Sequence, residues 1–402
     1  MMGYTRPAFE VAQIIGRYRH SLEDRGKLTS RQKRVFTNLE QCRTAALGYH
    51  KDKCDNPDCN HEHISFNSCR DRHCPKCNGL RREKWVRMRT HDLLPVKYYH
   101  VVFTVPDSLN QMFLDYQVLM YNLLFACVWQ TIRQFGADHK HLGAKMGIIA
   151  VLHSWGQNLS FHPHVHCLVP AGGITANGKW RNTRSEGKYL FPVKAMSKVF
   201  RGKFTDGLIS LHKSNKIQLE TPFIAGKKYL HPFYRKKWVT YAKLPMHNAQ
   251  QVVDYIGRYT HRIAISNHRI KAVENDRVKF SAIDYRTSRR VEVDLEAEEF
   301  LHRFSLHILP AGFMKIRHYG ILSSRSKSAA LNCARVSLGA EIPEPLKTGS
   351  FFVYEWLVKL YGTDVRACPK CKTGKMILTT IIYPRSRGSP QEGIIENACF
   401  AA

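Results

Sequence analysis

The segment "FHPHVHCLVP", residues 161–170, is apolar except for a histidine at every second position. Successive side chains of a β-strand point to opposite faces, so a strand here would place His162, His164 and His166 on one face. The residues between them would anchor the other face in a hydrophobic core. The preceding segment, residues 145–157, is also apolar and β-branched, and we expect the two segments to pair across a short turn.

The chain is long and strongly basic. Its 402 residues suffice for two or three domains with hydrophobic cores. The 62 lysines and arginines outnumber the 32 aspartates and glutamates, which gives a formal net charge of +30 at pH 7. A basic excess of this size favours a polyanionic partner, and nucleic acid is the default choice. A generally basic surface without such a partner is the alternative interpretation.

The sequence predicts a cytoplasmic, nucleoid-associated protein that has no membrane partner. The opening segment, residues 1–26, carries charges from its start and contains no long apolar block of the kind found in secretory signals. The most apolar helical stretch, residues 118–132, is too short to span a bilayer. Half of the twelve cysteines crowd between Cys42 and Cys77 among histidines, which indicates metal binding in a reducing compartment rather than disulfides.

The cysteine-rich block predicts structural zinc. Cys74 and Cys77 form a tight pair, Cys54 and Cys59 form a wider one, and two such pairs make a four-thiolate zinc site. Four further residues are candidates for a second ion: Cys42, His50, Cys69 and His73. Buried free cysteines are the alternative to zinc.

Two further details of the cysteine pattern remain open. His61 and His63 are possible substitutes in either set of zinc ligands. Near the other end of the chain Cys368 and Cys371 form a tight pair, but no second pair follows them, so no site is assigned there. The basic segment beside the cysteine block, residues 81–89, predicts that the zinc-binding module contacts DNA.

Pattern and composition predict a mixture of helices and strands. Apolar residues spaced three and four apart predict helices, whereas β-branched and aromatic runs predict strands. Helices are expected within residues 8–45, 78–94, 107–136, 248–264 and 296–309, and strands within 97–106, 145–157, 160–173 and 277–295.

The histidine segment is a candidate site for a catalytic metal ion. Such an ion needs only two or three protein ligands, because substrate must occupy the remaining positions. His164 and His166 supply two imidazoles from one strand, and the neighbouring strand supplies Gln157 as the nearest polar residue. His162 competes with Gln157 for the third position. A polar sheet face without any metal is the alternative.

The segment 248–264 supplies candidate nucleophiles. Tyr255 and Tyr259 are four residues apart and would share one face of a helix. A tyrosine hydroxyl has a pKa of about 10 and attacks poorly unless a divalent ion polarises the phosphate. Cationic side chains beside the pair suit phosphate oxygens, namely Arg258, His261 and Arg262. Core packing for the tyrosines, and a solvated helix end for the cations, are the alternatives.

Four motifs in this order resemble the IS-ninety-one-like insertion-sequence transposases, relatives of the rolling-circle (HUH) replication initiators. The motifs are "SCRDRHCPKC", "FHPHVHCLVPAGG", "YIGRYTHRIAISN" and "IRHYGILSSRSK", and the resemblance extends over roughly residues 10–376. It implies an α+β fold with an N-terminal helical and zinc-binding module, followed by an HUH endonuclease domain. That domain would be a replication-initiator-like antiparallel sheet with helices on its face. The expected domains are residues 1–90, 91–325 and 326–402, the last with the Cys-x-x-Cys pair and a loose tail.

The resemblance implies a metal-dependent transposase that nicks single-stranded DNA and transfers the strand. Tyr255 and Tyr259 would form 5′-phosphotyrosine intermediates at transposon ends, and His164 and His166 would hold the metal. The expected cofactors are structural Zn²⁺ and catalytic Mg²⁺ or Mn²⁺. No nucleotide cofactor is expected, because the chain lacks a phosphate-binding G-x-x-x-x-G-K-[ST] loop. The alternative is a non-catalytic, zinc-dependent DNA-binding regulator.

Overall fold

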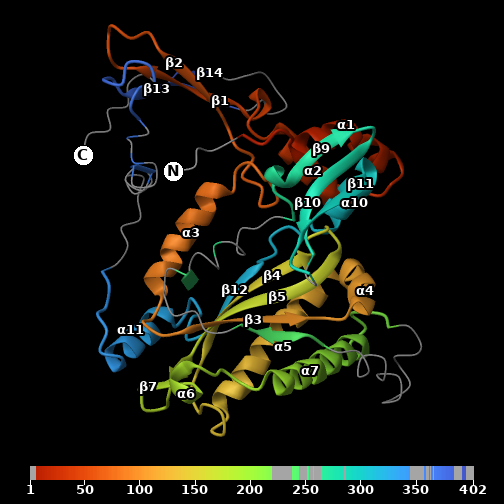
Figure 1. The fold of residues 1–402 in the computed structure, drawn as a ribbon, viewed down its shortest axis with the longest axis vertical. Helices are drawn as coiled ribbons and strands as arrows, with labels where there is room; N and C mark the ends of the chain where they lie inside the picture. Colours follow the sequence, from red (N-terminus) through yellow and green to blue (C-terminus); the bar gives the residue numbers. More distant parts are fainter. Residues whose placement is uncertain are drawn as a thin grey trace.

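A five-stranded antiparallel sheet forms the centre of the molecule (Figure 1). The computed structural model describes residues 6–219, 238–243, 251–252, 257, 264–284, 287–344, 357–358, 362, 364, 366–383 and 392–394. The central strands, in spatial order, are β12 (Ile316–Gly320), β4 (Gly147–Trp155), β5 (Phe161–Pro170), β3 (Tyr98–Thr104) and β8 (Thr240–Ala242). Every neighbouring pair is antiparallel, which confirms the predicted α+β class with a central antiparallel sheet.

Helices cover one face of this sheet. They are α4 (Asn110–Asp115), α5 (Gln117–Ala137) and α7 (Val193–Lys213), with the short α6 (Arg184–Gly187) and the hairpin β6 (Gly172–Ile174)–β7 (Trp180–Asn182) nearby (Figure 1). The covered face contributes Val101 and Phe103 of β3 and Val165, Cys167 and Val169 of β5 to one hydrophobic core with α5 and α7. Burial of these alternating residues fixes the register of the strands, because a shift by one residue would expose them.

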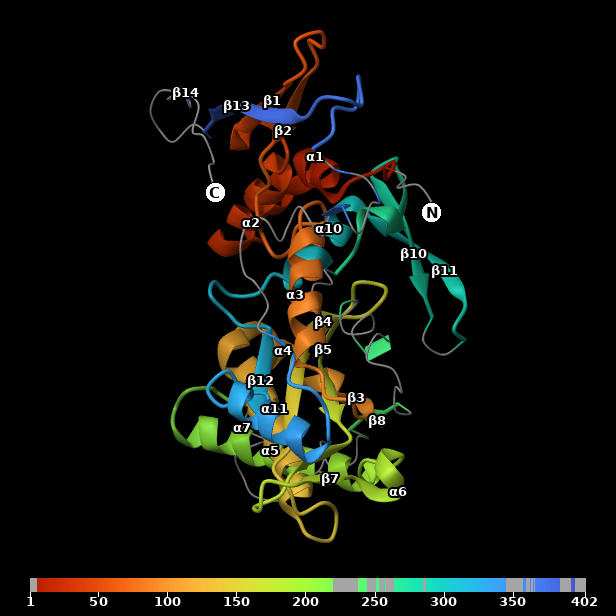
Figure 2. The same ribbon diagram turned by 90° about the vertical axis from the view of Figure 1, so that its left-hand side faces the viewer.

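The other face of the sheet is covered by α3 (Gly79–Asp92) and α11 (Lys327–Ser337) (Figure 2). Ile149 and Val151 of β4 and Leu168 of β5 form a second core there with Leu331 and Ala334 of α11. The two faces therefore alternate along β4 and β5, as the sequence predicted for residues 161–170.

A helical unit lies beyond one end of the sheet. The helices α1 (Val11–Asp24), α2 (Ser30–Gln41) and α10 (Ala297–Leu306) share a core with the three-stranded sheet β11 (Arg290–Glu296)–β10 (Arg277–Ile283)–β9 (Ile270–Glu274). Thr29 caps α2 by accepting a hydrogen bond from the Gln32 backbone amide, a standard way to satisfy the first turn of a helix. This core therefore combines residues from the expected N-terminal domain, 1–90, with residues from the expected central domain, 91–325.

A small sheet at one end of the molecule combines strands from residues 49–66 with strands from residues 376–394 (Figures 1 and 2). Its order is β14 (Glu392–Ile394), β13 (Met376–Ile382), β1 (Tyr49–Cys54) and β2 (Glu62–Phe66). The C-terminal β13 pairs antiparallel with β1, from Tyr49 opposite Ile382 to Cys54 opposite Met376. The C-terminal extension, predicted as a separate unit, therefore contributes strands to the N-terminal module. Across the described ranges, no helix is long and apolar enough to cross a membrane.

Candidate functional site

The histidines of β5 lie on the face opposite α5 and α7. Val165 and Cys167 point into the core on the helical side, so His164 and His166 point to the side that carries Leu168. On β4, His153 lies directly opposite His164, and Val151 lies opposite His166. The pairing therefore places two histidines of β5 beside one histidine of β4.

Three imidazoles on these strands form a compact group. One ring nitrogen from each of His153, His164 and His166 lies within 4.8 Å of the others. His164 uses Nδ1 to donate a hydrogen bond of 2.7 Å to the His162 carbonyl oxygen, which leaves Nε2 unprotonated for a metal ion. His166 Nδ1 lies 2.7 Å from Nε2 of His100 on β3. Such outer hydrogen bonds fix the orientation of ligating histidines.

The donor set fits a divalent transition-metal ion. The Nε2 atoms of His164 and His166 are 3.0 Å apart, so two nitrogen lone pairs converge on one point. Two ligands each about 2.1 Å from one ion and at right angles would be separated by roughly this distance. Burial lowers the pKa of His164 to about 4 and that of His100 to about 3. Both rings are therefore neutral at pH 7, the form in which imidazole binds metal.

The predicted extent of the neighbouring strand is wrong. β4 ends at Trp155, and its register with β5 shifts between His153 and Trp155. Gln157 therefore lies in the turn, where its backbone carbonyl accepts a hydrogen bond from Arg269. His153 is the third imidazole of the group instead. The alternation rule applied to β4 would have identified it, because Val151 and His153 share a face.

The predicted nucleophiles and their cationic neighbours lie outside the described residues: Tyr255, Arg258, Tyr259, His261 and Arg262. Two residues of the same segment are described. Val252 is fully buried in the core that contains Val151 and Leu168, on the histidine-bearing face of the sheet. A side chain at Gly257 would lie 2.7 Å from Val86 of α3. These two described residues therefore lie on the side of the central sheet that carries the three imidazoles.

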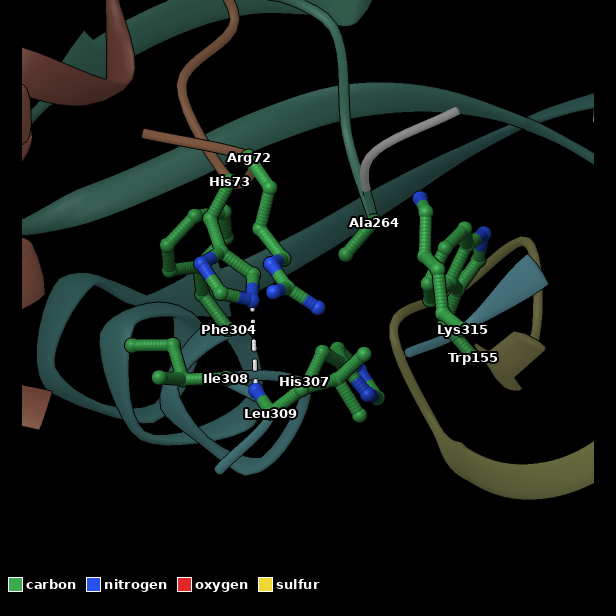
Figure 3. A pocket seen from close by; sticks show the side chains of 9 residues that line it. All are labelled: Arg72, His73, Trp155, Ala264, Phe304, His307, Ile308, Leu309 and Lys315. Carbon is green, nitrogen blue, oxygen red and sulfur yellow. Dashed lines mark hydrogen bonds between the residues drawn. The ribbon is translucent and has the colours of Figure 1, made fainter. Parts of the chain in front are cut away.

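A small cavity lies close to the imidazole group (Figure 3). Its lining includes Arg72, Lys315, Trp155 and His307, so it joins the cysteine block, the sheet and the end of α10. The Trp155 ring stacks on His153 with 4.6 Å between centroids, which connects the cavity to the group. Burial and the nearby Arg72 lower the pKa of Lys315 to about 7. The cavity has a volume of about 20 Å³, which is room for about one water molecule.

The eight cysteines of the zinc-binding end form two clusters of four. The first contains Cys42, Cys69, Cys74 and Cys77, and the second contains Cys54, Cys59, Cys368 and Cys371. In the first cluster the Sγ atoms of Cys42 and Cys74 are 3.5 Å apart, and those of Cys69 and Cys77 are 3.8 Å apart. Backbone amides of Cys69, Asp71 and Lys76 donate to these sulfurs, which stabilises thiolates.

This grouping corrects the predicted ligand sets. Cys54 and Cys59 do not join Cys74 and Cys77; they join the pair near the C-terminus, to which no site was assigned. His50 lies on β1 outside both clusters. Both ring nitrogens of His73 have other partners, because Nδ1 lies 2.8 Å from Asp71 and Nε2 accepts from the Leu309 amide. The prediction grouped cysteines that are close in sequence into one zinc site. In the fold, Cys54 and Cys59 instead cluster with Cys368 and Cys371, which are far away in sequence.

Two families of known proteins match the chain. Residues 14–105 match the family described as "Transposase zinc-binding domain" and residues 147–329 match that described as "Putative transposase". The first range contains all four cysteines of the first cluster and two of the second, Cys54 and Cys59. The second contains the three imidazoles and segment 248–264.

Two curated relatives align over nearly their whole length. The chain is 41% identical over 391 residues to "Putative transposase y4qJ" of Sinorhizobium fredii (strain NBRC 101917 / NGR234), covering 95% of this chain and 97% of the relative. It is 28% identical over 380 residues to "Transposase for insertion sequence element IS801" of Pseudomonas savastanoi pv. phaseolicola, covering 90% of this chain and 87% of the relative. No solved structure gives a significant match.

Proposed function

Because the chain belongs to the family of IS91-type transposases, we propose that it nicks single-stranded DNA at transposon ends and transfers the strand through phosphotyrosine intermediates. The observation that carries this proposal is the convergence of His153, His164 and His166 on one point of the central sheet. A site of three imidazoles leaves positions open for phosphate oxygens, as a catalytic rather than a structural metal site requires.

The catalytic ion would be Mn²⁺ or Mg²⁺, and the three imidazoles would hold it. Imidazole ligands favour manganese over magnesium, and zinc has the same donor preference. When bound, the ion would polarise a phosphate oxygen and offset the charge that develops during attack. The protein's own part is to orient the imidazoles through the His162 carbonyl and His100, and to keep His164 neutral by burial.

The nucleophile would be Tyr255 or Tyr259. Its phenolic oxygen forms a bond to phosphorus, the bond from phosphorus to the 3′ oxygen breaks, and the phenolic proton is lost as the 3′ hydroxyl forms. One phosphodiester replaces another, so a 3′ hydroxyl can later displace the tyrosine without a nucleotide cofactor. Two tyrosines would allow a second cleavage while the first strand stays attached.

Chain geometry supports the assignment of the tyrosines. Tyr255 is three residues from the buried Val252, so their α-carbons are within roughly 11 Å even in a fully extended chain. Tyr259 is two residues from Gly257 and lies within roughly 7 Å of it by the same reasoning. Val252 lies in the core on the side of the sheet that carries the imidazoles, and Gly257 lies beside Val86 of α3, which covers that side. These positions support the choice of the two neighbouring tyrosines as nucleophiles.

The charge of the protein supports a nucleic-acid substrate. The formal charge of +30 attracts the phosphate backbone regardless of sequence.

The test is to incubate the full-length protein with labelled single-stranded DNA from the element's ends and Mn²⁺. We expect a protein–DNA adduct that survives denaturation and is lost in His164→Ala and in the double variant Tyr255→Phe/Tyr259→Phe. DNA binding should persist in both variants. If the double variant still formed the adduct, or cleavage left no protein on the 5′ end, the tyrosine mechanism would be wrong. A zinc-dependent regulator would give mobility shifts without any adduct.

A further inference from the structure

We propose that Cys54, Cys59, Cys368 and Cys371 bind a second structural zinc ion, which fastens the C-terminal segment to the N-terminal module. The family match to a zinc-binding domain ends at residue 105, so it does not include Cys368 and Cys371. The site therefore combines two ligands inside that domain with two from a segment more than 300 residues further along the chain.

Sulfur geometry in this cluster matches zinc and not disulfides. The Sγ atoms of Cys54 and Cys371 are 3.7 Å apart, and those of Cys59 and Cys368 are 3.8 Å apart. Four sulfurs placed tetrahedrally about 2.3 Å from one zinc ion are separated by about 3.8 Å. A disulfide would require about 2.05 Å. All four ligand atoms lie within 4.8 Å of one another.

The backbone at Gly374 packs directly against two of the four sulfurs. The Gly374 amide donates to the Cys371 sulfur over 3.3 Å. A side chain at Gly374 would meet the Cys54 sulfur at 2.4 Å, so only glycine fits between the two halves of the site. The Asp55 amide donates to the Lys375 carbonyl, and the Lys375 amide donates to the Asp55 carboxylate. The two chain segments thus meet at the cluster through specific contacts.

Among the described side chains of the small sheet at this end, few are buried and apolar. Its buried cluster consists of Cys54, Cys59 and Cys368, with Cys371 and Met376 partly buried against it. Several of its larger apolar side chains remain exposed, with Ile377 at 52% and Leu378 at 47% of their surface. A sheet that buries so little apolar surface needs another source of stability, and zinc binding to four thiolates supplies it in small domains. The cluster lies where that stability is required, at the junction of β1 and β13.

The first test is the zinc content of full-length protein purified under reducing conditions. The double variant Cys368→Ser/Cys371→Ser should contain one zinc ion fewer than the wild type. The matched variant Cys69→Ser/Cys77→Ser should lose one ion from the first cluster. Cys333→Ser should lose none, because Cys333 is exposed and belongs to neither cluster. An unchanged zinc content in the Cys368→Ser/Cys371→Ser protein would overturn the proposal.

The second test uses the wild-type protein and does not depend on the folding of a variant. Thiol alkylation followed by mass spectrometry should show Cys54, Cys59, Cys368 and Cys371 protected until a zinc chelator is added. Cys333 should react with or without the chelator. If the four thiols react as fast as Cys333 before chelation, no metal holds them. Both readouts measure metal binding, so they stand apart from the nicking assay.

Discussion

The hydrogen bond between His100 and His166 is predicted to control the affinity of the catalytic site for its metal. We expect His100→Phe to weaken Mn²⁺ binding while leaving the fold intact. Phenylalanine retains an aromatic ring at this position, where the two imidazoles now lie edge to edge with centroids 5.0 Å apart and an angle of 14° between the planes. The substitution removes the Nε2 acceptor that lies 2.7 Å from Nδ1 of His166.

The size of the effect follows from the burial of this pair. His100 is only 6% exposed, so water has little access to replace the lost acceptor. Leaving a buried donor without a partner costs about 1–3 kcal/mol. Loss of an outer hydrogen bond to a ligating histidine typically weakens metal binding about 10- to 100-fold, which corresponds to roughly 1.4–2.8 kcal/mol. The two arguments agree, and we expect a loss of affinity within this range.

Isothermal titration with Mn²⁺ of protein that keeps its structural zinc but has an empty imidazole site measures this loss directly. His100→Gln should recover part of the affinity, because its amide oxygen is an acceptor. The matched control is His162→Ala, since His164 bonds to the backbone carbonyl of residue 162 and not to its ring. If His100→Phe binds Mn²⁺ as tightly as the wild type, or His162→Ala weakens binding equally, the assigned hydrogen-bond pattern is wrong.

Three other predictions follow from the same structure. His153→Ala should reduce Mn²⁺ affinity by about 100-fold or more in the same titration, whereas Gln157→Ala should leave it within about threefold; the reverse result would restore Gln157 as the ligand. Burial lowers the pKa of His307 to about 4, whereas the same residue in the unfolded chain has a pKa of about 6.5. As the pH falls from 6.5 to 4, His307 is therefore protonated in the unfolded chain but not in the folded protein. This residue alone should lower the free energy of unfolding by about 3 kcal/mol over that range. Urea unfolding of His307→Gln across that range should show a shallower pH dependence than the wild type, and equal slopes would contradict the assignment. Gly320→Ala should lower the free energy of unfolding by about 2–4 kcal/mol, since Gly320 has φ +61° and an added Cβ would lie 1.9 Å from the Met146 carbonyl oxygen; an unchanged melting temperature would refute this.

Local patterns predicted the local structure well. The alternation in residues 161–170 identified β5 and the face on which its histidines lie, because a strand has a period of two. The helices α1, α2, α3 and α10 also fall within the predicted segments. The error at Gln157 arose where the chain leaves the sheet, and strand ends are set by turn geometry as much as by composition.

Long-range combinations were not predictable in this way. Spacing suggested that neighbouring cysteines share an ion, but sheet pairing brings Cys54 to Cys371 across the whole chain. The same limit applied to the hydrophobic cores, because nothing local indicates that β9–β11 pack on α1 and α2. The roles of Tyr255 and Tyr259 remain predictions, since both residues lie outside the described part of the chain.

The pairing of β1 with β13 has a consequence for biosynthesis. Tyr49 leaves the ribosome long before Ile382, its partner in the register, so the N-terminal module stays incomplete through most of translation. A copy of the gene with a stop codon before residue 368 would yield an N-terminal module that lacks β13, the strand beside β1. The module would also lack the thiolates of Cys368 and Cys371. A mutation that truncates the C-terminus would therefore also destabilise the N-terminal module, which is synthesised first.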